Sequence, residues 1–173
     1  YFPNTSLSGT PVLTRTEALD SVWTGSPGAG LPADGWSARW TGFVRLPTTG
    51  VYTFEVIADD GLRATINGQT FASAWVSSGN KTYRSAAING TAGALVPVLI
   101  EHYDGTGDSS VRLRWNAPSA PQYWVPVPLA QLLQTGTAVN NPPSVALTAP
   151  ASAAVGVGVA LSASASDSDG TVS

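Results

Sequence analysis

Two groups of acidic side chains carry the chemistry that this sequence is equipped to perform. Asp59 and Asp60 are adjacent and stand directly before Gly61, while Asp104 and Asp108 enclose the tripeptide Gly-Thr-Gly. Carboxylate oxygens are ligands that Ca²⁺ takes in proteins, and the ion needs about six to eight oxygens in all. If the two groups meet in the fold, the sequence predicts a Ca²⁺ site with Asp59, Asp60, Asp104 and Asp108 as metal ligands.

The same residues have a simpler explanation as turns. Asp-Gly between two alternating runs is a strong β-hairpin signal, and glycine with aspartate is the usual composition of a hairpin loop. Neighbouring carboxylates on a regular strand point to opposite faces, so Asp59 and Asp60 can share one ion only if the backbone between them bends. A cis peptide bond would supply the bend at a cost of about 3–4 kcal/mol, which persists only where something offsets it. The residues alone favour the turn, and a turn that also clamps a metal satisfies both explanations.

Tryptophan is the second chemical feature, with six residues in the chain. An exposed aromatic side chain beside a metal would form a binding site for a sugar ring. Trp75, between two expected strands, is interpreted either as such a platform or as a lid over the core, and the core is slightly favoured. The other five are expected in the core (Trp40, Trp115), as anchors of the glycine- and proline-rich loop 25–35 (Trp23, Trp36), or near an edge (Trp124).

Catalysis has little support in the sequence. There is no Cys and one His, which excludes thiolate chemistry and His-rich metal sites. Glu101 and His102 are consecutive on an expected strand, so they face opposite sides and do not act together. Glu55 is expected to pair with Arg or with solvent. No nucleophile with a nearby base is visible, and we therefore expect no enzyme activity and no catalytic residue.

Composition narrows the class of protein further. The chain has 173 residues, a net charge of −3, and 11% charged residues, with eight Lys and Arg that never cluster. This pattern excludes a basic nucleic-acid binder. No run of about eighteen apolar residues is present, so nothing is expected to span a membrane. Low charge with many Thr, Ser, Gly and Trp residues indicates an exported protein.

Short alternating runs separated by Gly and Pro must position these residues. Residues 51–58 are the clearest, because Tyr52, Phe54, Val56 and Ala58 alternate with a mixed face. Further strands are expected at residues 39–46, 62–67, 82–88, 94–103, 110–116 and 124–127. Helical turns are expected only at residues 17–21 and 129–134. This pattern predicts an all-β sandwich or barrel.

A domain boundary is expected between residues 137 and 138. Residues 138–173 contain no Lys, Arg or aromatic residue, and residues 140–143 are Asn-Asn-Pro-Pro, a typical linker. Residues 144–148 and 155–165 follow as two expected strands, and residues 167–170 resemble the start of a calcium loop only weakly. Thirty-six residues are too few to bury a sandwich core, so we expect the opening of a second domain.

The ordered set of motifs in residues 1 to about 135 resembles a known family, the PA-fourteen module first named for the N-terminal fragment of anthrax protective antigen. The matching strings are residues 14–17, 30–34, 37–42, 50–54, 59–61, 66–68, 100–103 and 113–115. The resemblance implies a jelly-roll-like β-sandwich used as an accessory module in secreted glycosidases, adhesins and toxins. In the lectin branch of this family an Asp-Asp pair joined by a cis peptide binds Ca²⁺, and the ion binds sugar hydroxyls; Asp59 and Asp60 fall on that pair. The tail resembles the opening of a bacterial Ig-like or polycystic-kidney-disease-type repeat.

These observations lead to an expected function. The chain is interpreted as a Ca²⁺-dependent carbohydrate-binding module of a secreted or cell-surface bacterial enzyme or adhesin, with Asp59, Asp60 and Trp75 at the sugar. Its partners would be a glycan and the neighbouring domains of a longer chain. The alternative is a structural spacer that binds no sugar. With the resemblance, the metal explanation of the acidic pair becomes the favoured one.

Overall fold

The computed structural model describes residues 1–134, 144–148 and 162–166. The chain divides into two compact units, Tyr1–Gly136 and Thr137–Ser173. In the second unit β12 (Ser144–Thr148) pairs antiparallel with β13 (Ser162–Ser166), and β12 coincides with an expected strand. The weak calcium-loop resemblance at residues 167–170 lies outside the described residues. No helix of the described residues has the length and apolarity to cross a bilayer.

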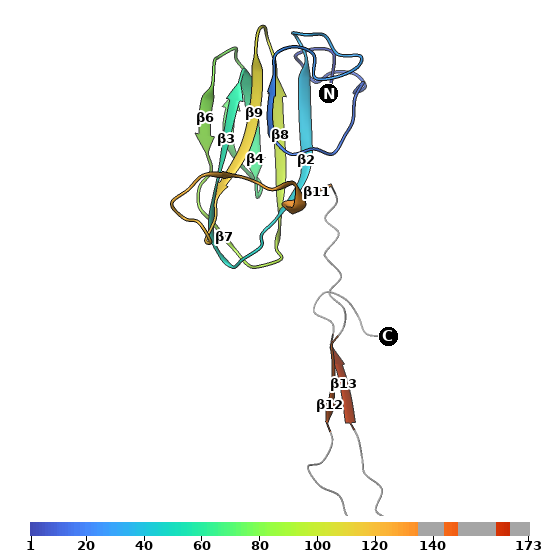
Figure 1. The fold of residues 1–173 in the computed structure, drawn as a ribbon, viewed down its shortest axis with the longest axis vertical. Helices are drawn as coiled ribbons and strands as arrows, with labels where there is room; N and C mark the ends of the chain where they lie inside the picture. Colours follow the sequence, from blue (N-terminus) through green and yellow to red (C-terminus); the bar gives the residue numbers. More distant parts are fainter. Residues whose placement is uncertain (135–143, 149–161, 167–173) are drawn as a thin grey trace, which may run out of the picture. The chain divides into compact units, whose positions relative to one another are not determined.

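The first unit is built from two antiparallel sheets, which confirms the predicted all-β sandwich (Figure 1). One sheet has the order β1-β9-β3-β6, where β10 also pairs with β9 and β7 with β3. Its strands are β1 (Asp20–Trp23), β3 (Gly50–Asp59), β6 (Lys81–Arg84), β7 (Ile88–Gly90), β9 (Ser109–Asn116) and β10 (Val125–Pro126). The other sheet has the order β11-β2-β8-β4-β5. Its strands are β2 (Ser37–Arg45), β4 (Gly61–Ile66), β5 (Gln69–Ala74), β8 (Leu95–Tyr103) and β11 (Leu132–Leu133).

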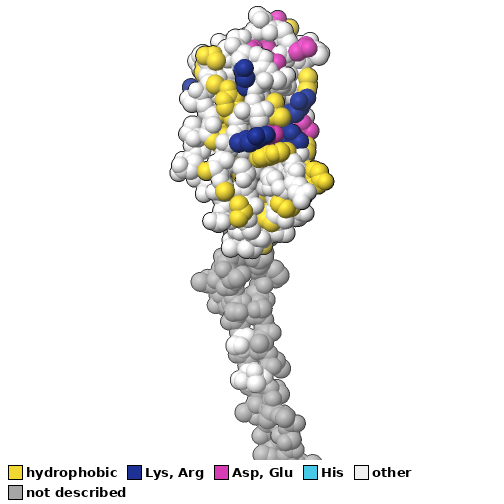
Figure 2. Space-filling view, turned by 90° about the vertical axis from the view of Figure 1, so that its left-hand side faces the viewer, with side chains coloured by type: hydrophobic (Ala, Val, Ile, Leu, Met, Phe, Trp, Pro, Cys, Tyr) yellow, Lys and Arg dark blue, Asp and Glu magenta, His cyan; other side chains and the backbone are white. Residues whose placement is uncertain are grey.

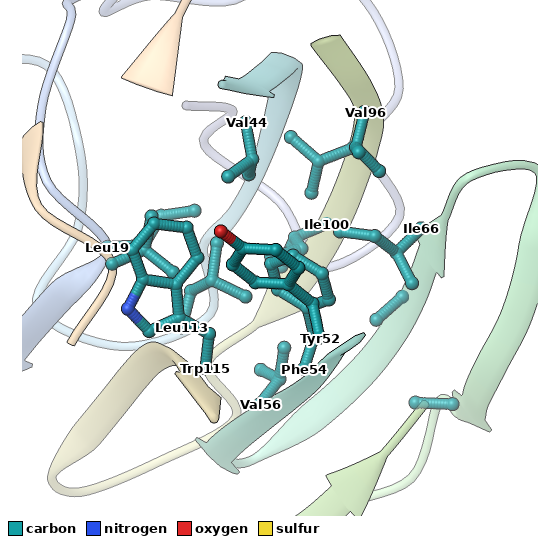
Figure 3. Packing of buried hydrophobic residues seen from close by; sticks show 14 of the residues in the cluster. Leu19, Val44, Tyr52, Phe54, Val56, Ile66, Val96, Ile100, Leu113 and Trp115 are labelled. Atoms are coloured by element: carbon teal, nitrogen blue, oxygen red, sulfur yellow. The ribbon is translucent and has the colours of Figure 1, made fainter. Parts of the chain in front are cut away.

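The core lies between the two sheets and follows the alternation read from the sequence. Tyr52, Phe54 and Val56 of β3 are fully buried, and they meet Ile66 and Ile100 of the opposite sheet in one cluster (Figure 3). Burying each such side chain contributes about 1.5–3 kcal/mol before conformational entropy is counted. This hydrophobic core holds in place the strands whose ends carry the acidic residues.

The hairpin expected at Asp59–Gly61 is wrong. β3 ends at Asp59 and β4 begins at Gly61, but β3 pairs with β9 and β4 pairs with β8, in different sheets. The chain therefore crosses from one sheet to the other at Asp60. The hairpin reading of residues 104–108 fails in the same way, because this loop connects β8 to β9. Both segments connect strands of different sheets, because burying the core between the two sheets contributes more than a local hairpin turn.

Strand register brings the two crossings together. Gly61 lies opposite Tyr103, and Asp59 lies opposite Ser110. The end of β3 and the end of β8 therefore belong to the same end of the sandwich, at the top of Figure 1. Two segments more than forty residues apart in sequence become neighbours through backbone pairing alone.

Three local expectations also need correction. Residues 17–21 were expected as a helical turn, but Asp20 and Ser21 belong to β1, which pairs with β9. The expected strand at 82–88 is two strands, because β6 and β7 pair with different parts of β3. Of the helical candidate 129–134, only Leu129–Gln131 forms a 3₁₀ turn, and β11 follows it. In each case pairing with a distant strand decides the outcome.

Candidate functional site

Asp60 anchors the crossing between the sheets. Its side chain is buried, and its Oδ1 accepts hydrogen bonds from the Ser77 hydroxyl at 2.8 Å and the Ser78 amide at 2.9 Å. Its Oδ2 accepts one from the Gly105 amide at 2.7 Å. One carboxylate thus joins the β5–β6 loop to the β8–β9 loop, the two loops that surround the crossing.

Asp104 is buried without a partner. It is fully inaccessible, and neither of its carboxylate oxygens has a hydrogen bond of good geometry within the described residues, although the Gly35 backbone amide is near enough to lower its pKa. Its backbone amide donates to the Trp36 carbonyl at 2.9 Å, which holds the residue in place. Burial, followed by the charges of Asp34 and Asp60, raises the pKa of Asp104 to about 6. A buried polar group without a partner costs free energy, so these oxygens are candidate ligands for a cation.

Asp59 completes the adjacent pair. The Asp59–Asp60 peptide bond is cis, as the resemblance implied. Burial raises the pKa of Asp59, and the charges of Asp60 and Asp108 raise it further. The structure therefore places Asp59 and Asp60 within electrostatic reach of Asp104 and Asp108, the four residues that the sequence singled out.

Asp34 is a member of this group that the sequence analysis did not single out. Its Oδ1 accepts a hydrogen bond from the Gly107 amide at 2.8 Å, and its charge acts on Asp104. The glycine- and proline-rich loop 25–35 therefore borders the site. The family string at residues 30–34 was the available signal. We call Asp34, Asp59, Asp60, Asp104 and Asp108 together the acidic end.

A buried histidine lies beneath the acidic end. His102 Nδ1 is 3.0 Å from the Gly61 carbonyl oxygen, and Nε2 is 2.7 Å from the Ser109 hydroxyl oxygen. The ring packs against the indoles of Trp23 and Trp36, at centroid distances of 6.4 and 5.5 Å, and these two indoles also contact each other. Burial lowers the pKa of His102 to about 4, so the imidazole is neutral at neutral pH. Glu101 pairs with arginines on the outer face while His102 is buried, so the two side chains face opposite sides as predicted.

Aromatic side chains form a rim beside the acids. Trp75 is half-buried; the Arg63 guanidinium lies 4.1 Å from its ring centroid, and its indole N–H donates to the Thr5 carbonyl at 3.2 Å. Its ring centroid is 5.0 Å from that of Tyr103. Tyr103 in turn packs so closely on Gly61 that a β-carbon there would lie 2.0 Å from the ring. Trp75 thus lies outside both buried core clusters, and its role as a platform for a sugar stays a prediction.

The charges of the molecule are distributed unevenly. In the part of the chain that the structure describes, no residue of the acidic end forms an ion pair with Lys, Arg or His. The buried Glu55 and Glu101 are paired with arginines on the outer faces of the two sheets. Figure 2 shows acidic side chains at the upper end of the view and, across the middle, a band of Lys and Arg side chains with acidic side chains beside them. The acidic end therefore lacks the counter-charge that other buried carboxylates possess.

The donors at the acidic end suit a hard divalent cation. Ca²⁺ prefers carboxylate and carbonyl oxygens, and Asp104 offers two buried oxygens with no other partner. Among residues 1–134 and the two described strands of the tail, no three His, Cys, Asp or Glu side chains already stand in a metal-binding arrangement. The carboxylates would therefore have to draw together around an ion, with backbone carbonyls as further ligands.

A separate cavity of about 360 Å³ lies away from these residues. It is lined by residues 14–17, the middle of β2, and Leu132 to Gln134, and it contains no member of the acidic end. Its charged groups are already engaged, since Arg15 pairs with Glu17 at 2.7 Å and Arg39 with Glu101 at 2.6 Å. The cavity's charged groups are therefore paired, whereas the carboxylate oxygens of Asp104 at the acidic end have no hydrogen-bond partner.

Comparison with known proteins places this geometry in a family. Anti-sigma-I factor RsgI3 of Acetivibrio thermocellus is 28% identical over 127 residues, which make up 73% of this chain and 20% of that protein. The structure of an anti-sigma factor domain-containing protein from Clostridium clariflavum has 30% identity and a TM-score of 0.68, over 78% of this chain and 46% of that one. The PA14 sugar-binding domain from an RTX adhesin has 22% identity and a TM-score of 0.53, over 69% of this chain and 77% of that one.

The chain thus spans a fifth of its curated relative and less than half of the clostridial protein. The likeness to the adhesin domain shows a shared fold. A family model for the PA14 domain matches residues 1–126, which confirms the resemblance drawn from the motifs of the first unit. Because that match covers well over half of the sequence, the chain belongs to the PA14 domain family.

Proposed function

We propose that this chain is a Ca²⁺-dependent carbohydrate-binding module without catalytic activity of its own. The observation that carries the proposal is Asp104, a buried carboxylate with both oxygens unpaired, which lies near Asp59 and Asp60; none of the three forms an ion pair among the described residues. Asp108, exposed at the rim of the same loop, is the fourth ligand in the proposal.

In this proposal each of the three aspartates at the crossing and the β8–β9 loop has its own role. Asp60 is oriented by three hydrogen bonds from two loops, so its remaining lone pairs have a fixed direction. Asp104 excludes water from its side of the site because it is fully buried. Asp59 lies closer to solvent and borders the position of the sugar. When bound, the ion would supply open coordination positions for a pair of sugar hydroxyls.

The aromatic rim provides the apolar part of the proposed site. Trp75 and Tyr103 lie together beside the crossing, and Val76 next to them has 59% of its surface exposed. A sugar ring has apolar C–H faces, and apolar side chains beside a few oriented polar groups are typical of ligand sites. Arg63 and the Thr5 carbonyl hold the Trp75 indole in one orientation, which reduces the entropy lost on binding.

The similar proteins support the proposal at the level of the domain. The adhesin domain of the same fold is described as sugar-binding, whereas the two more similar proteins are anti-sigma factors. A module that recognises a glycan would act as a receptor in either kind of parent protein. We place it outside the cell, secreted or on the surface, because the ligand and the Ca²⁺ concentration that such a site needs are found there.

Calorimetric titration with Ca²⁺ after chelation tests the metal. The unsubstituted protein should bind the ion, and Asp60→Ala should abolish the heat. Asp20→Ala is the matched control, because Asp20 is an exposed aspartate on β1 that pairs with Arg112 at 3.5 Å and should leave binding unchanged. Absence of heat at millimolar Ca²⁺ would support the alternative, a spacer that binds neither ion nor sugar.

A glycan array with and without chelator tests the sugar. Signals that disappear in chelator and in Asp60→Ala support the proposed function. Signals that survive chelation would show a purely aromatic site and overturn the role of the ion. An array without signals, on a protein that binds Ca²⁺, would favour a structural metal.

A further inference from the structure

The proposed metal ligands lie on the crossing at Asp59–Gly61 and on the β8–β9 loop. One buried pair of side chains contacts both of these segments. His102 lies near the end of β8, and Ser109 is the first residue of β9, so they flank the loop that carries Asp104. Both are buried, with 0% and 2% of their surface exposed. Neither was assigned a role at the metal by the motifs of the sequence.

This pair contacts the backbone on both sides of Asp60. His102 Nδ1 is 3.0 Å from the Gly61 carbonyl oxygen. The Ser109 hydroxyl oxygen is 3.0 Å from the Asp59 carbonyl oxygen and 2.7 Å from His102 Nε2. With the imidazole neutral, Nδ1 carries the proton that is donated to Gly61, and the single hydroxyl proton of Ser109 has two acceptors within reach. The Gly61 carbonyl therefore has its own donor in the imidazole, while the Asp59 carbonyl and His102 Nε2 share the Ser109 proton.

From this arrangement, which rests on the function proposed above, we infer that His102 and Ser109 are positioning residues of the Ca²⁺ site. They touch neither the ion nor the sugar. They set the distance between the Asp59–Asp60 pair and Asp104, so that the carboxylates of both loops reach one ion. The indoles of Trp23 and Trp36 fix the imidazole ring plane and so make the spacing rigid.

Outer groups of this kind are worth a measurable part of metal affinity, typically 10- to 100-fold. We therefore expect Ser109→Ala to weaken Ca²⁺ binding at least tenfold while every carboxylate stays in place. Ser110→Ala is the matched control: the neighbouring serine is also buried, but its hydroxyl donates to the Asn80 side chain at 3.1 Å rather than to the crossing. Its Ca²⁺ affinity should stay within twofold of the unsubstituted protein, and Ser109→Thr, which keeps a hydroxyl, should recover most of the loss.

A second measurement separates positioning from general stability. The Gly105 amide donates to Asp60 Oδ2, so its hydrogen exchange reports the contact between the two loops without any metal. In chelator, Ser109→Ala should speed Gly105 exchange while amides of the β3 core exchange as before. His102→Asn and His102→Gln, which replace one ring nitrogen at a time, should each speed Gly105 exchange. They also serve as second variants should Ser109→Ala fold poorly.

The outcomes are distinct. Unchanged Ca²⁺ affinity and unchanged Gly105 exchange in Ser109→Ala overturn the inference. A loss of affinity matched by faster exchange throughout the β3 core also overturns it, because the role would then be structural. If the unsubstituted protein binds no Ca²⁺, the proposed function fails and with it the link to a metal, whereas faster Gly105 exchange alone in Ser109→Ala would still support a positioning role in the apo loops.

Discussion

Four carboxylates are buried in this domain, and they fall into two pairs with opposite surroundings. Glu55 on β3 and Glu101 on β8 each occupy the outer face of a sheet, between arginines from the two flanking strands. Asp60 and Asp104 at the acidic end have no such partner among the described residues. The same chemical group is thus buried twice with counter-charge and twice without it.

The two glutamates show how the chain itself supplies the counter-charge for a buried carboxylate. Glu55 accepts from Arg84 at 2.8 Å and Arg114 at 3.2 Å, and the strand register places both arginines directly opposite it. Glu101 is held in the same way by Arg39 and Arg63. Cross-strand neighbours of opposite charge stabilise a sheet, so these pairs belong to the scaffold. At the acidic end the described residues provide no such pair.

The largest effect should follow from breaking a scaffold pair. Glu55→Gln removes the charge that holds two arginines, and we expect about 2–3 kcal/mol of lost stability, less than for a fully buried pair because Arg84 and Arg114 reach solvent. Urea unfolding measures this loss. The affinity for Ca²⁺ should not change. In Asp20→Asn, which breaks an exposed pair, the loss should stay below about 1 kcal/mol.

The same carboxylate-to-amide change at the acidic end should raise the stability of the Ca²⁺-free protein rather than lower it. Asp104→Asn removes a buried charge without a partner, and its amide can donate to neighbouring carboxylates, so the Ca²⁺-free protein should gain about 1 kcal/mol. Ca²⁺ binding should be lost in the same variant. Urea unfolding in chelator gives the first result and calorimetry the second. A destabilisation like that of Glu55→Gln would remove the distinction between the two pairs.

The pH dependence sharpens the comparison further. The pKa of Asp104 is raised in the folded state to about 6 from its ordinary 3.8, so its ionised form costs stability above pH 6 and this cost disappears as the pH falls toward 4. The advantage of Asp104→Asn in chelator should therefore shrink between pH 7 and pH 4.5. The pKa of His102, lowered to about 4, acts in the opposite direction in both proteins and cancels in the difference. Thermal unfolding of both proteins across this range is the measurement, and a constant difference would contradict the assignment.

The smallest effect is expected where the two regions meet. Arg63 belongs to the Glu101 pair and also lies over Trp75 at the rim of the acidic end. Trp75→Ala should lower glycan affinity about fivefold, roughly 1 kcal/mol of aromatic contact, and leave Ca²⁺ affinity unchanged. Titration of a glycan identified on the array, at saturating Ca²⁺, measures it. Equal losses for ion and glycan would instead give Trp75 a structural role.

Much of the sandwich was predictable because alternation is a local property. β3 and β9 show it plainly, with Phe54 and Trp115 on the buried faces as expected. The strands that escaped notice are short or lie at edges. β1 was mistaken for a helical turn and β5 was not expected, because their apolar residues are few and their formation depends on β9 and β4.

The candidate site was predictable only in its parts. The acidic pairs stand out in the sequence, and Glu55 pairs with arginine as expected. Which acids meet depends on two crossings between sheets, and local turn chemistry predicted hairpins there instead. Asp34, His102 and Ser109 take their places through contacts over tens of residues in sequence, with Gly107, Gly61 and Asp59 respectively, and no spacing rule brings them together.

The crossing from β8 to β9 has a practical consequence for engineering. Asp104 and Ser109 are buried at the two ends of this loop, whereas Thr106, Gly107 and Asp108 between them are exposed. A surface segment held at both ends tolerates insertion at small entropic cost. Libraries that vary the length and composition of the chain at Thr106, with Asp104 and the segment from Gly107 to Ser109 constant, should therefore change the surface of this loop on an unchanged scaffold.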